Sequence, residues 1–206
     1  MSPPDLMMEN RLWANGKTPA GVDESGRGPL AGPVVAAAVI LPEGSNIIGL
    51  DDSKKLTHAQ REALLERIVS SALAFAIGIV HHEEIDRINI LRASLLAMEI
   101  AVNRLERKPD FLLIDGNQRT SLLIPQETVV KGDSKCCSIA AASIVAKVNR
   151  DKLMDEYHEH YPEYNFRSHK GYPTREHLEA IRKYGPCPIH RRSFRGVIQT
   201  ELRINL

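Results

Sequence analysis

The chain has 206 residues, of which 43% are hydrophobic, and its 27 basic and 26 acidic side chains nearly cancel. This length allows one sizeable core, and no apolar run approaches the ~20 residues that a membrane-spanning helix needs. Residues 1–17 show no charged start followed by an apolar block, so we expect a cytoplasmic protein without a secretory signal. The three cysteines, an odd number, argue against a disulfide framework.

The hydrophobic pattern predicts a flexible leader over 1–15 and a single domain over 16–206, which includes a basic C-terminal helical segment. Short apolar runs predict strands over 19–24, 34–41 and 72–80. Between the last two, a helix begins at Thr57, whose spacing with Gln60 is that of a capping box. A second apolar stripe predicts a helix from about Asn89.

Two later segments are interpreted as apolar runs: 111–114, which is apolar at every position, and 128–131, which has Val129-Val130 at its centre. Such runs are typical of interior strands in a sheet that helices cover on both sides. Helices are predicted after them over 134–160 and 174–184. The chain is therefore expected to form an α/β domain with a central mixed five-stranded sheet, flanked by helices, and a helical C-terminal extension.

Four acidic residues stand beside the predicted strands. Asp23 and Glu24 end the first strand, Asp115 follows the fourth, and Asp133 precedes the long helix. Sheets of this kind bind ligands at the carboxyl ends of their strands. If these ends are neighbours, the like charges need a compensating cation, and carboxylates without His or Cys ligands favour Mg²⁺ or Mn²⁺.

Each acid also has a structural interpretation. Aspartate is preferred at helix N-caps, which is one role open to Asp133. Asp115 and Gly116 form an ordinary turn sequence. The pair Asp23-Glu24 is harder to explain in this way, because adjacent residues of a regular strand face opposite sides and a pair at a buried edge needs a bulge or a ligand.

Other chemistries find less support. Residues 26–31 match the dinucleotide-binding pattern G-x-G-x-x-A, but that pattern must open a helix, and here prolines and a strand follow. Neither a G-x-S-x-G elbow nor a phosphate-binding G-x-x-x-x-G-K-[ST] loop is present. The pairs His81-His82 and Cys187/His190 lack partners at zinc spacing, so we expect surface or packing roles for them.

The segment 167–195 is strongly basic. It contains eight basic residues against two acids, Glu176 and Glu179, with three histidines between them; the basic residues are Arg167, Lys170, Arg175, Arg182, Lys183, Arg191, Arg192 and Arg195. This composition indicates contact with phosphates, although a solvated helix face has the same composition.

Five motifs follow one another along the chain: "GVDESGRGPLAGPVVAAAVIL", "DSKKL", "LLIDGN", "VVKGDSKCCSIAAASIVAKVNRD" and "HKGYPTREH". Together they resemble the motifs of bacterial ribonuclease HII, the type 2 ribonucleases H. The resemblance covers about 20–194. It implies a ribonuclease H-like fold and an endonuclease that hydrolyses the RNA strand of RNA/DNA hybrids. It also implies cutting 5′ to single ribonucleotides in DNA, which leaves 5′-phosphate and 3′-hydroxyl ends, with two divalent ions (Mg²⁺ or Mn²⁺). The catalytic, metal-binding residues implied are Asp23, Glu24, Asp115 and Asp133.

The resemblance also assigns residues to the substrate. It assigns recognition of the ribonucleotide to Gly26, Arg27 and Gly28, here called the reader loop, since glycines let the backbone reach the 2′-hydroxyl. It makes Tyr172 the residue that stacks on the sugar beyond the RNA-to-DNA junction. Further candidates for phosphate contacts are Lys54 or Lys55, Ser143 and Lys147; Ser143 also fits helix packing, and Lys147 and Tyr172 also fit plain surface positions.

Two features depart from the family pattern. Cys136 and Cys137 stand where small or polar residues are expected, which predicts an oxidation-sensitive helix start. No sliding-clamp peptide is recognised in 197–206, which leaves a clamp partner open; we expect a monomer. Two rival interpretations are another two-metal nuclease of related fold, such as an exonuclease, and a non-catalytic module that binds nucleic acid through the basic segment.

Overall fold

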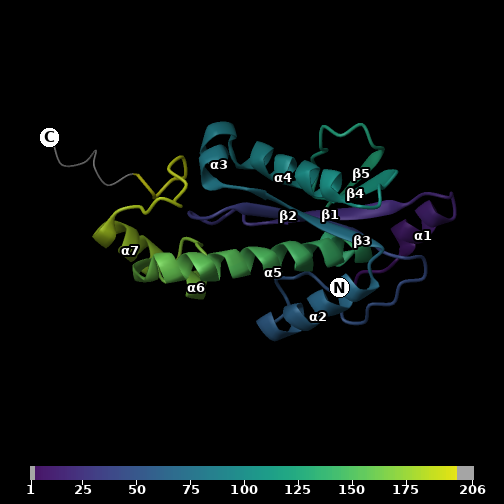
Figure 1. The fold of residues 1–206 in the computed structure, drawn as a ribbon, viewed down its shortest axis with the longest axis horizontal. Helices are drawn as coiled ribbons and strands as arrows, with labels where there is room; N and C mark the ends of the chain where they lie inside the picture. The colour runs from purple at the N-terminus through teal and green to yellow at the C-terminus, as the bar shows by residue number, and fades with distance from the viewer. Residues whose placement is uncertain (1–2, 199–206) are drawn as a thin grey trace.

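A computed structural model describes residues 3–198 of the chain, and within them five strands form one mixed sheet (Figure 1). The order is β3-β2-β1-β4-β5, with β1 (Pro19–Ser25), β2 (Val34–Ile40), β3 (Ala74–Val80), β4 (Phe111–Asp115) and β5 (Gln126–Val129). The first three strands form an antiparallel meander, whereas β4 runs parallel to β1 and β5 parallel to β4. This order places the carboxyl ends of β1 and β4 next to each other.

Helices cover both faces of the sheet (Figure 1). One face carries α3 (His82–Ile88) and α4 (Ile90–Arg104), with a core that includes Met98 and Ile114. The other carries α2 (His58–Ser71) and α5 (Cys137–His160), with a core that includes Ile68 and Ile144. Because both faces are covered, β2 is buried along its whole length, which explains its uninterrupted apolar sequence.

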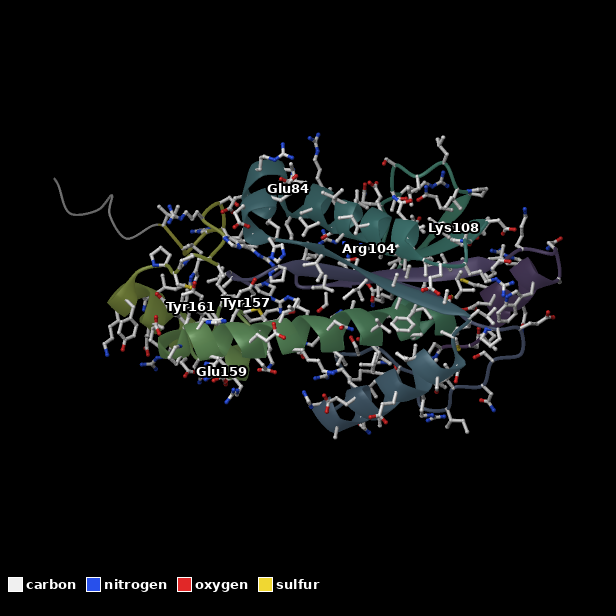
Figure 2. All side chains as sticks on the ribbon, viewed as in Figure 1. Glu84, Arg104, Lys108, Tyr157, Glu159 and Tyr161 are labelled. Atoms are coloured by element: carbon white, nitrogen blue, oxygen red, sulfur yellow. The ribbon has the colours of Figure 1, made fainter. Side chains whose placement is uncertain are left out.

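Beyond α5 the chain forms a helical extension of η2 (Pro162–Tyr164), α6 (Phe166–His169) and α7 (Arg175–Tyr184). Its core joins Met154 of α5 to Phe166, to Ile181 and to Leu30 of the loop after β1. Figure 2 shows Tyr157 and Tyr161 on one side of α5 and Glu159 on the opposite side, in keeping with the packing of both tyrosines against this cluster. The extension is therefore packed onto the loop that follows the first strand.

The structure confirms the predicted mixed five-stranded sheet, its flanking helices and the helical extension. It also confirms the capping box: the Gln60 amide donates to Thr57 Oγ1 at 3.3 Å, and the Thr57 amide donates to Gln60 Oε1 at 2.8 Å. The strand expected at 128–131 lies two residues earlier. A separate α3 was not predicted; it is divided from α4 by Asn89, which has a φ of 70° and caps α4 by accepting from the Arg92 amide.

Within the expected flexible leader, the structure contains α1 (Met7–Trp13), which packs against the start of α5. Glu9 is fully buried, and its Oε1 accepts from the Ser138 amide at 2.7 Å and from Cys136 Sγ at 3.0 Å. Glu9 of the leader therefore caps the start of α5. This contact joins residues far apart in the sequence, so local periodicity does not reveal it.

Within residues 3–198, no helix combines the length and the apolar character that crossing a membrane requires. The C-terminal segment 197–206, in which no clamp peptide was recognised, lies mostly outside the described residues.

Candidate active site

Four acidic side chains gather at one edge of the sheet. In the parallel pairing of β1 and β4, Val22 stands opposite Ile114, and the next residues along the two strands are Asp23 and Asp115. The chain after β5 returns through η1 (Gly132–Ser134), and the Gly132 amide donates to Asp115 Oδ1 at 2.6 Å. This bond holds the segment that carries Asp133 against the end of β4.

The pair Asp23-Glu24 lies in a regular strand, because its pairing with β2 runs without a bulge from Gly21 to Ser25. Asp23 is buried, and its Oδ1 accepts from the backbone amide of Glu24 at 2.7 Å. The Glu24 carboxylate has Arg27 Nη1 at 3.4 Å. The strand thus accommodates two adjacent acids without a bulge, and their side chains leave it on opposite faces of the sheet.

The charges of these acids are mutually unfavourable. Burial, followed by the charges of Glu24 and Asp115, raises the pKa of Asp23 well above its usual value. Burial also raises the pKa of Glu24, and Asp115 adds to this effect although Arg27 opposes it. Burial together with Asp52 and Asp115 raises the pKa of Asp133. Such a cluster of buried carboxylates is stabilised by a cation that takes up its charge.

Asp133 does not act as an N-cap of the long helix. It lies inside η1, while the N-cap of α5 is Cys136, which makes no side-chain capping bond. Its Oδ2 instead lies 4.0 Å from Lys54 Nζ. The capping interpretation of Asp133 is therefore wrong, and its carboxylate faces the same edge as the other three acids.

The four carboxylates fit a hard divalent cation by their chemistry. Among residues 3–198, no three His, Cys, Asp or Glu side chains are already gathered closely enough to hold a metal ion. The donors are all carboxylate oxygens, which Mg²⁺ and Mn²⁺ prefer, and the nearby cations Arg27 and Lys54 are largely exposed. The exposed cations compensate little of the negative charge on the four carboxylates, and a bound divalent cation would compensate the rest.

A cleft of about 630 Å³ opens beside these acids and collects the remaining predicted substrate residues. Its lining includes Glu24, Gly26, Arg27, Gly28, Lys54, Ser143, Lys147 and Tyr172. Of the two lysines left open by the sequence, Lys54 faces the acids, whereas Lys55 pairs with Asp51 at 2.7 Å. Burial by itself would lower the pKa of Lys54. The negative charges of Asp52 and Asp133 outweigh this effect, and the pKa is raised.

Ser143 and Lys147 are held by neighbours in the cleft wall. Ser143 Oγ lies 2.9 Å from Ser53 Oγ, and both side chains are buried. Lys147 Nζ donates to Asp151 Oδ1 at 2.8 Å and is only 17% exposed, so it is not the solvated helix residue that the sequence also allowed. The neighbouring Arg61, which sequence reasoning did not single out, also lines this cleft.

Two buried arginines hold the loop after β1, and no local pattern signals this role for either of them. Arg191 is fully buried, and its guanidinium donates to the carbonyls of Gly26 (2.7 Å), Arg27 (3.2 Å), Gly32 (2.9 Å) and Pro33 (3.1 Å). Arg150 donates to the carbonyls of Pro33, Ala31 and Lys170. Arg191 was expected to contact phosphates with the rest of the basic segment; that expectation is wrong, because the side chain has no access to solvent.

The surroundings of the two adjacent cysteines favour the neutral thiol over the thiolate. Cys136 is buried beside Glu9, and burial followed by the Glu9 charge raises its thiol pKa. Burial raises the pKa of Cys137 to about 12. Since the thiolate is the species that oxidises, the raised pKa values argue against the oxidation sensitivity of this helix start, which stays a prediction.

Comparison with known proteins identifies the family. The sequence model described as "Ribonuclease HII" matches residues 20–197. The chain belongs to the ribonuclease HII family. It is 57% identical over 190 residues to the ribonuclease HII of Geobacter metallireducens, covering 92% of this chain and 89% of the relative, and 58% identical over 190 residues to that of Geobacter sulfurreducens, covering 92% and 88%.

Solved structures agree with this membership. The crystal structure of the ribonuclease H2 from Pyrococcus horikoshii OT3 superposes with a TM-score of 0.73 at 30% identity, covering 87% of this chain and 95% of that chain. The ribonuclease H-like fold expected from the sequence motifs is thereby confirmed. As a member of the ribonuclease HII family, the chain is a ribonuclease H, an endonuclease that hydrolyses phosphodiester bonds, and this family depends on divalent metal ions.

Proposed function

We propose that this ribonuclease HII hydrolyses the RNA strand of RNA/DNA hybrids and cuts 5′ to single ribonucleotides embedded in DNA, leaving 5′-phosphate and 3′-hydroxyl ends. The observation that carries the proposal is the meeting of Asp23, Glu24, Asp115 and Asp133 at one sheet edge, beside a cleft lined by Gly26, Arg27, Gly28 and Tyr172. The proposal includes a monomeric enzyme that acts in the cytoplasm.

In this proposal the four carboxylates bind two divalent ions, Mg²⁺ or Mn²⁺. When bound, such ions activate water and stabilise the leaving oxygen of a phosphodiester. The carboxylates supply the negative charge that holds them, and the hydrogen bond from the Gly132 amide fixes the orientation of Asp115. No protein side chain serves as the nucleophile.

The residues around the cleft hold the nucleic acid. Arg27 and Lys54 are exposed next to the acids, where their charges suit the phosphates on either side of the scissile bond. Lys147 and Ser143 line the same cleft and extend this phosphate-contacting surface. The carbonyls of Gly26 and Arg27 are fixed by Arg191, so the backbone that meets the 2′-hydroxyl is ordered before substrate binds.

Tyr172 lines the cleft from the helical extension. The residue is 38% exposed, and it borders both this cleft and a second hollow of about 570 Å³ that contains Arg61, Lys147 and Arg167. This position suits stacking on the sugar of the deoxynucleotide that follows the ribonucleotide.

The proposal is tested with an end-labelled DNA duplex that contains one ribonucleotide, incubated with Mg²⁺, with Mn²⁺ and with chelator. We expect one cut, 5′ to the ribonucleotide, in the presence of either metal, and a product that a 5′-phosphate-dependent ligase can reseal. A ladder that shortens from the labelled end would indicate an exonuclease, and binding without cleavage would indicate a non-catalytic module.

A further inference from the structure

Three buried histidines pack behind Tyr172 in the helical extension. His169 of α6, His177 of α7 and His190 of the following segment are 8%, 0% and 1% exposed. The rings of His169 and His177 are stacked with centroids 4.5 Å apart, and those of His177 and His190 are 5.2 Å apart. Sequence reasoning treated these histidines as part of the basic segment or as ordinary packing residues.

The hydrogen bonds of two of these rings admit one arrangement of protons. His177 Nδ1 lies 2.9 Å from the Tyr172 carbonyl, which can only accept, so Nδ1 carries the hydrogen. In the neutral ring, His177 Nε2 is then an acceptor, and the nitrogen 3.0 Å away, His190 Nε2, must donate to it. His190 Nδ1 is left as an acceptor, and the Cys187 amide donates to it at 2.9 Å.

The reverse arrangement fails at the contact between His177 and the Tyr172 carbonyl. If His190 Nδ1 donated to the Cys187 carbonyl at 3.3 Å, His190 Nε2 would become an acceptor and His177 Nε2 would have to donate. His177 Nδ1 would then present a lone pair to the Tyr172 carbonyl across 2.9 Å. A second proton on His177, at Nε2, would set two N–H groups against each other across the 3.0 Å contact. A second proton on His190, at Nδ1, would face the N–H of the Cys187 amide across 2.9 Å.

His169 holds the residue next to Tyr172 in the same way. Its Nε2 lies 2.7 Å from the Tyr164 carbonyl and donates to it, so its Nδ1 is free to accept from the Gly171 amide at 3.2 Å. The backbone of two consecutive residues, Gly171 and Tyr172, is thus fixed by two stacked imidazoles. The Gly171 carbonyl in turn accepts from the Leu30 amide at 2.8 Å, which joins this turn to the loop after β1.

The surroundings of the rings favour their neutral forms. Burial lowers the pKa of His177 to about 4, with His169 acting in the same direction and Glu176 against it. Burial, then His177, His82 and His169, lower the pKa of His190 to about 4. The Cys187 thiol lies 3.1 Å from His190 Nδ1, and burial raises its pKa to about 11, so it stays neutral. Tyr164 and Phe166 complete the enclosure with ring contacts, and Arg191 follows His190 in the chain.

We propose that His177 and His190 are positioning residues for Tyr172: their single permitted proton arrangement fixes the peptide that carries the tyrosine and thereby sets the preference for a lone ribonucleotide over a continuous hybrid. This inference rests on the proposed junction role of Tyr172. Neither histidine contacts the acids of the active site; both act through the tyrosine.

The dependence on pH follows from the neutral rings. A histidine whose pKa falls from 6.5 in the unfolded chain to about 4 in the folded one stabilises the fold fully above 6.5. This stabilisation declines as the pH falls from 6.5 towards about 4, because the unfolded chain takes up the protons first. Acid therefore loosens the Tyr172 turn.

The direct test is the proton arrangement of the wild-type protein, read by ¹⁵N-detected NMR of the imidazoles. We expect His177 as the Nδ1–H tautomer and His190 as the Nε2–H tautomer at neutral pH, with neither ring titrating above about pH 5. The exposed His160 serves as the internal reference. The opposite tautomers, or a midpoint near 6.5 for either buried ring, would overturn the proposal.

The functional test is the ratio of initial cleavage rates on a single ribonucleotide in DNA and on a continuous RNA/DNA hybrid. His190→Phe removes the donor to His177, and we expect it to lower this ratio about fivefold, the effect of removing one net hydrogen bond. His190→Gln keeps one donor and one acceptor and should restore most of the ratio. The double variant His190→Phe with Tyr172→Ala should have the same ratio as Tyr172→Ala alone, whereas His160→Gln, the surface control, should match wild type.

These outcomes distinguish the positioning role of the histidines from the junction role of the tyrosine. If Tyr172→Ala lowers the ratio while His190→Phe leaves it unchanged, or if the two effects multiply in the double variant, the positioning role is wrong and the junction role stands. If Tyr172→Ala itself leaves the ratio unchanged, the junction role fails, and with it the link from the histidines to selectivity. Should His190→Phe fail to fold, the His190→Gln ratio and the wild-type tautomers decide.

Discussion

A Cβ atom added at Gly28 would lie 3.4 Å from Cε1 of Tyr172, so the glycine of the reader loop faces the tyrosine of the C-terminal extension across ordinary van der Waals distance. Two residues far apart in the sequence thus form the two sides of one narrow passage in the cleft. The contact with Tyr172 alone would tolerate a side chain, so in the proposed function the glycine at position 28 keeps this space open for the substrate.

We predict that Gly28→Ala reduces cleavage at a single ribonucleotide more than about tenfold, because the methyl group occupies space needed for close approach of the sugar. The free protein should keep its thermal stability, since the methyl group has room against Tyr172. Gly26→Ala is the contrasting variant: its Cβ would meet Arg150 Nε at 2.2 Å and its φ is +104°, so it should lower the melting temperature as well. Equal activity of Gly28→Ala and wild type would contradict the reader role.

We predict that Asp115→Asn lowers the cleavage rate by more than about 100-fold, beyond the 10–100-fold typical of changes next to a metal ligand. The amide oxygen of asparagine can still accept from the Gly132 amide, so the fold and the melting temperature should be preserved. Glu106→Gln is the matched control, because it also removes one carboxylate but at an exposed position. Near-normal turnover of Asp115→Asn at saturating Mg²⁺ would remove Asp115 from the metal site.

Asp133→Asn should also be severely impaired, with a melting temperature close to that of wild type. The side chain makes no capping bond to α5 in the structure, so its replacement should cost the helix little. The measurement is the Mg²⁺ concentration that gives half-maximal rate, which should rise well above the wild-type value. Unchanged metal dependence would show that the carboxylate serves only the local 3₁₀ turn.

The adjacent residues Arg191 and Arg192 should behave in opposite ways. Arg191→Met leaves the carbonyls of Gly26, Arg27 and Gly32 without this donor, whereas that of Pro33 still accepts from Arg150. The variant should destabilise the protein by about 3 kcal/mol or more, as measured by urea unfolding. Arg192→Met, at an exposed position, should leave stability within about 0.5 kcal/mol. Equal stability of the two variants would contradict the structural role of Arg191.

Replacement of Arg192 and Arg195 together should weaken binding to ribonucleotide-containing and all-DNA duplexes alike. For every phosphate that the variant no longer binds, the slope of log affinity against log salt should fall by about 0.9. Both side chains are exposed, unlike Arg191, which the basic composition alone would have grouped with them. An unchanged salt slope would mean that this part of the segment does not bind the duplex.

Much of the fold follows from local sequence patterns. Strand runs such as 34–41 are apolar at every position, and the Thr57/Gln60 box fixes a helix start within a few residues, so periodicity and capping chemistry predict these elements directly. The four acids could be placed at strand ends because each follows an apolar run or precedes a helix. Their meeting depends on the parallel pairing of β1 with β4, which strand patterns suggest but do not determine.

The residues that sequence reasoning missed are those whose roles depend on distant partners. Glu9 is a buried cap for a helix in the second half of the chain, and Arg191, near the C-terminus, holds a loop that follows the first strand. A charged residue in a polar stretch is interpreted as solvated unless its partners are known. The histidines behind Tyr172 are a similar case, because their proton arrangement depends on carbonyls and amides from separate segments.

The central claim, a metal-dependent endonuclease directed at ribonucleotides, is tested most directly with covalently closed circular DNA that contains one ribonucleotide. We expect wild-type protein to convert this circle to the nicked form with Mg²⁺ or Mn²⁺, chelator and Asp115→Asn both to prevent nicking, and an all-DNA circle to stay closed. A circle that stays closed under conditions in which the linear duplex is degraded from its ends, or nicking that persists in chelator, would contradict the claim.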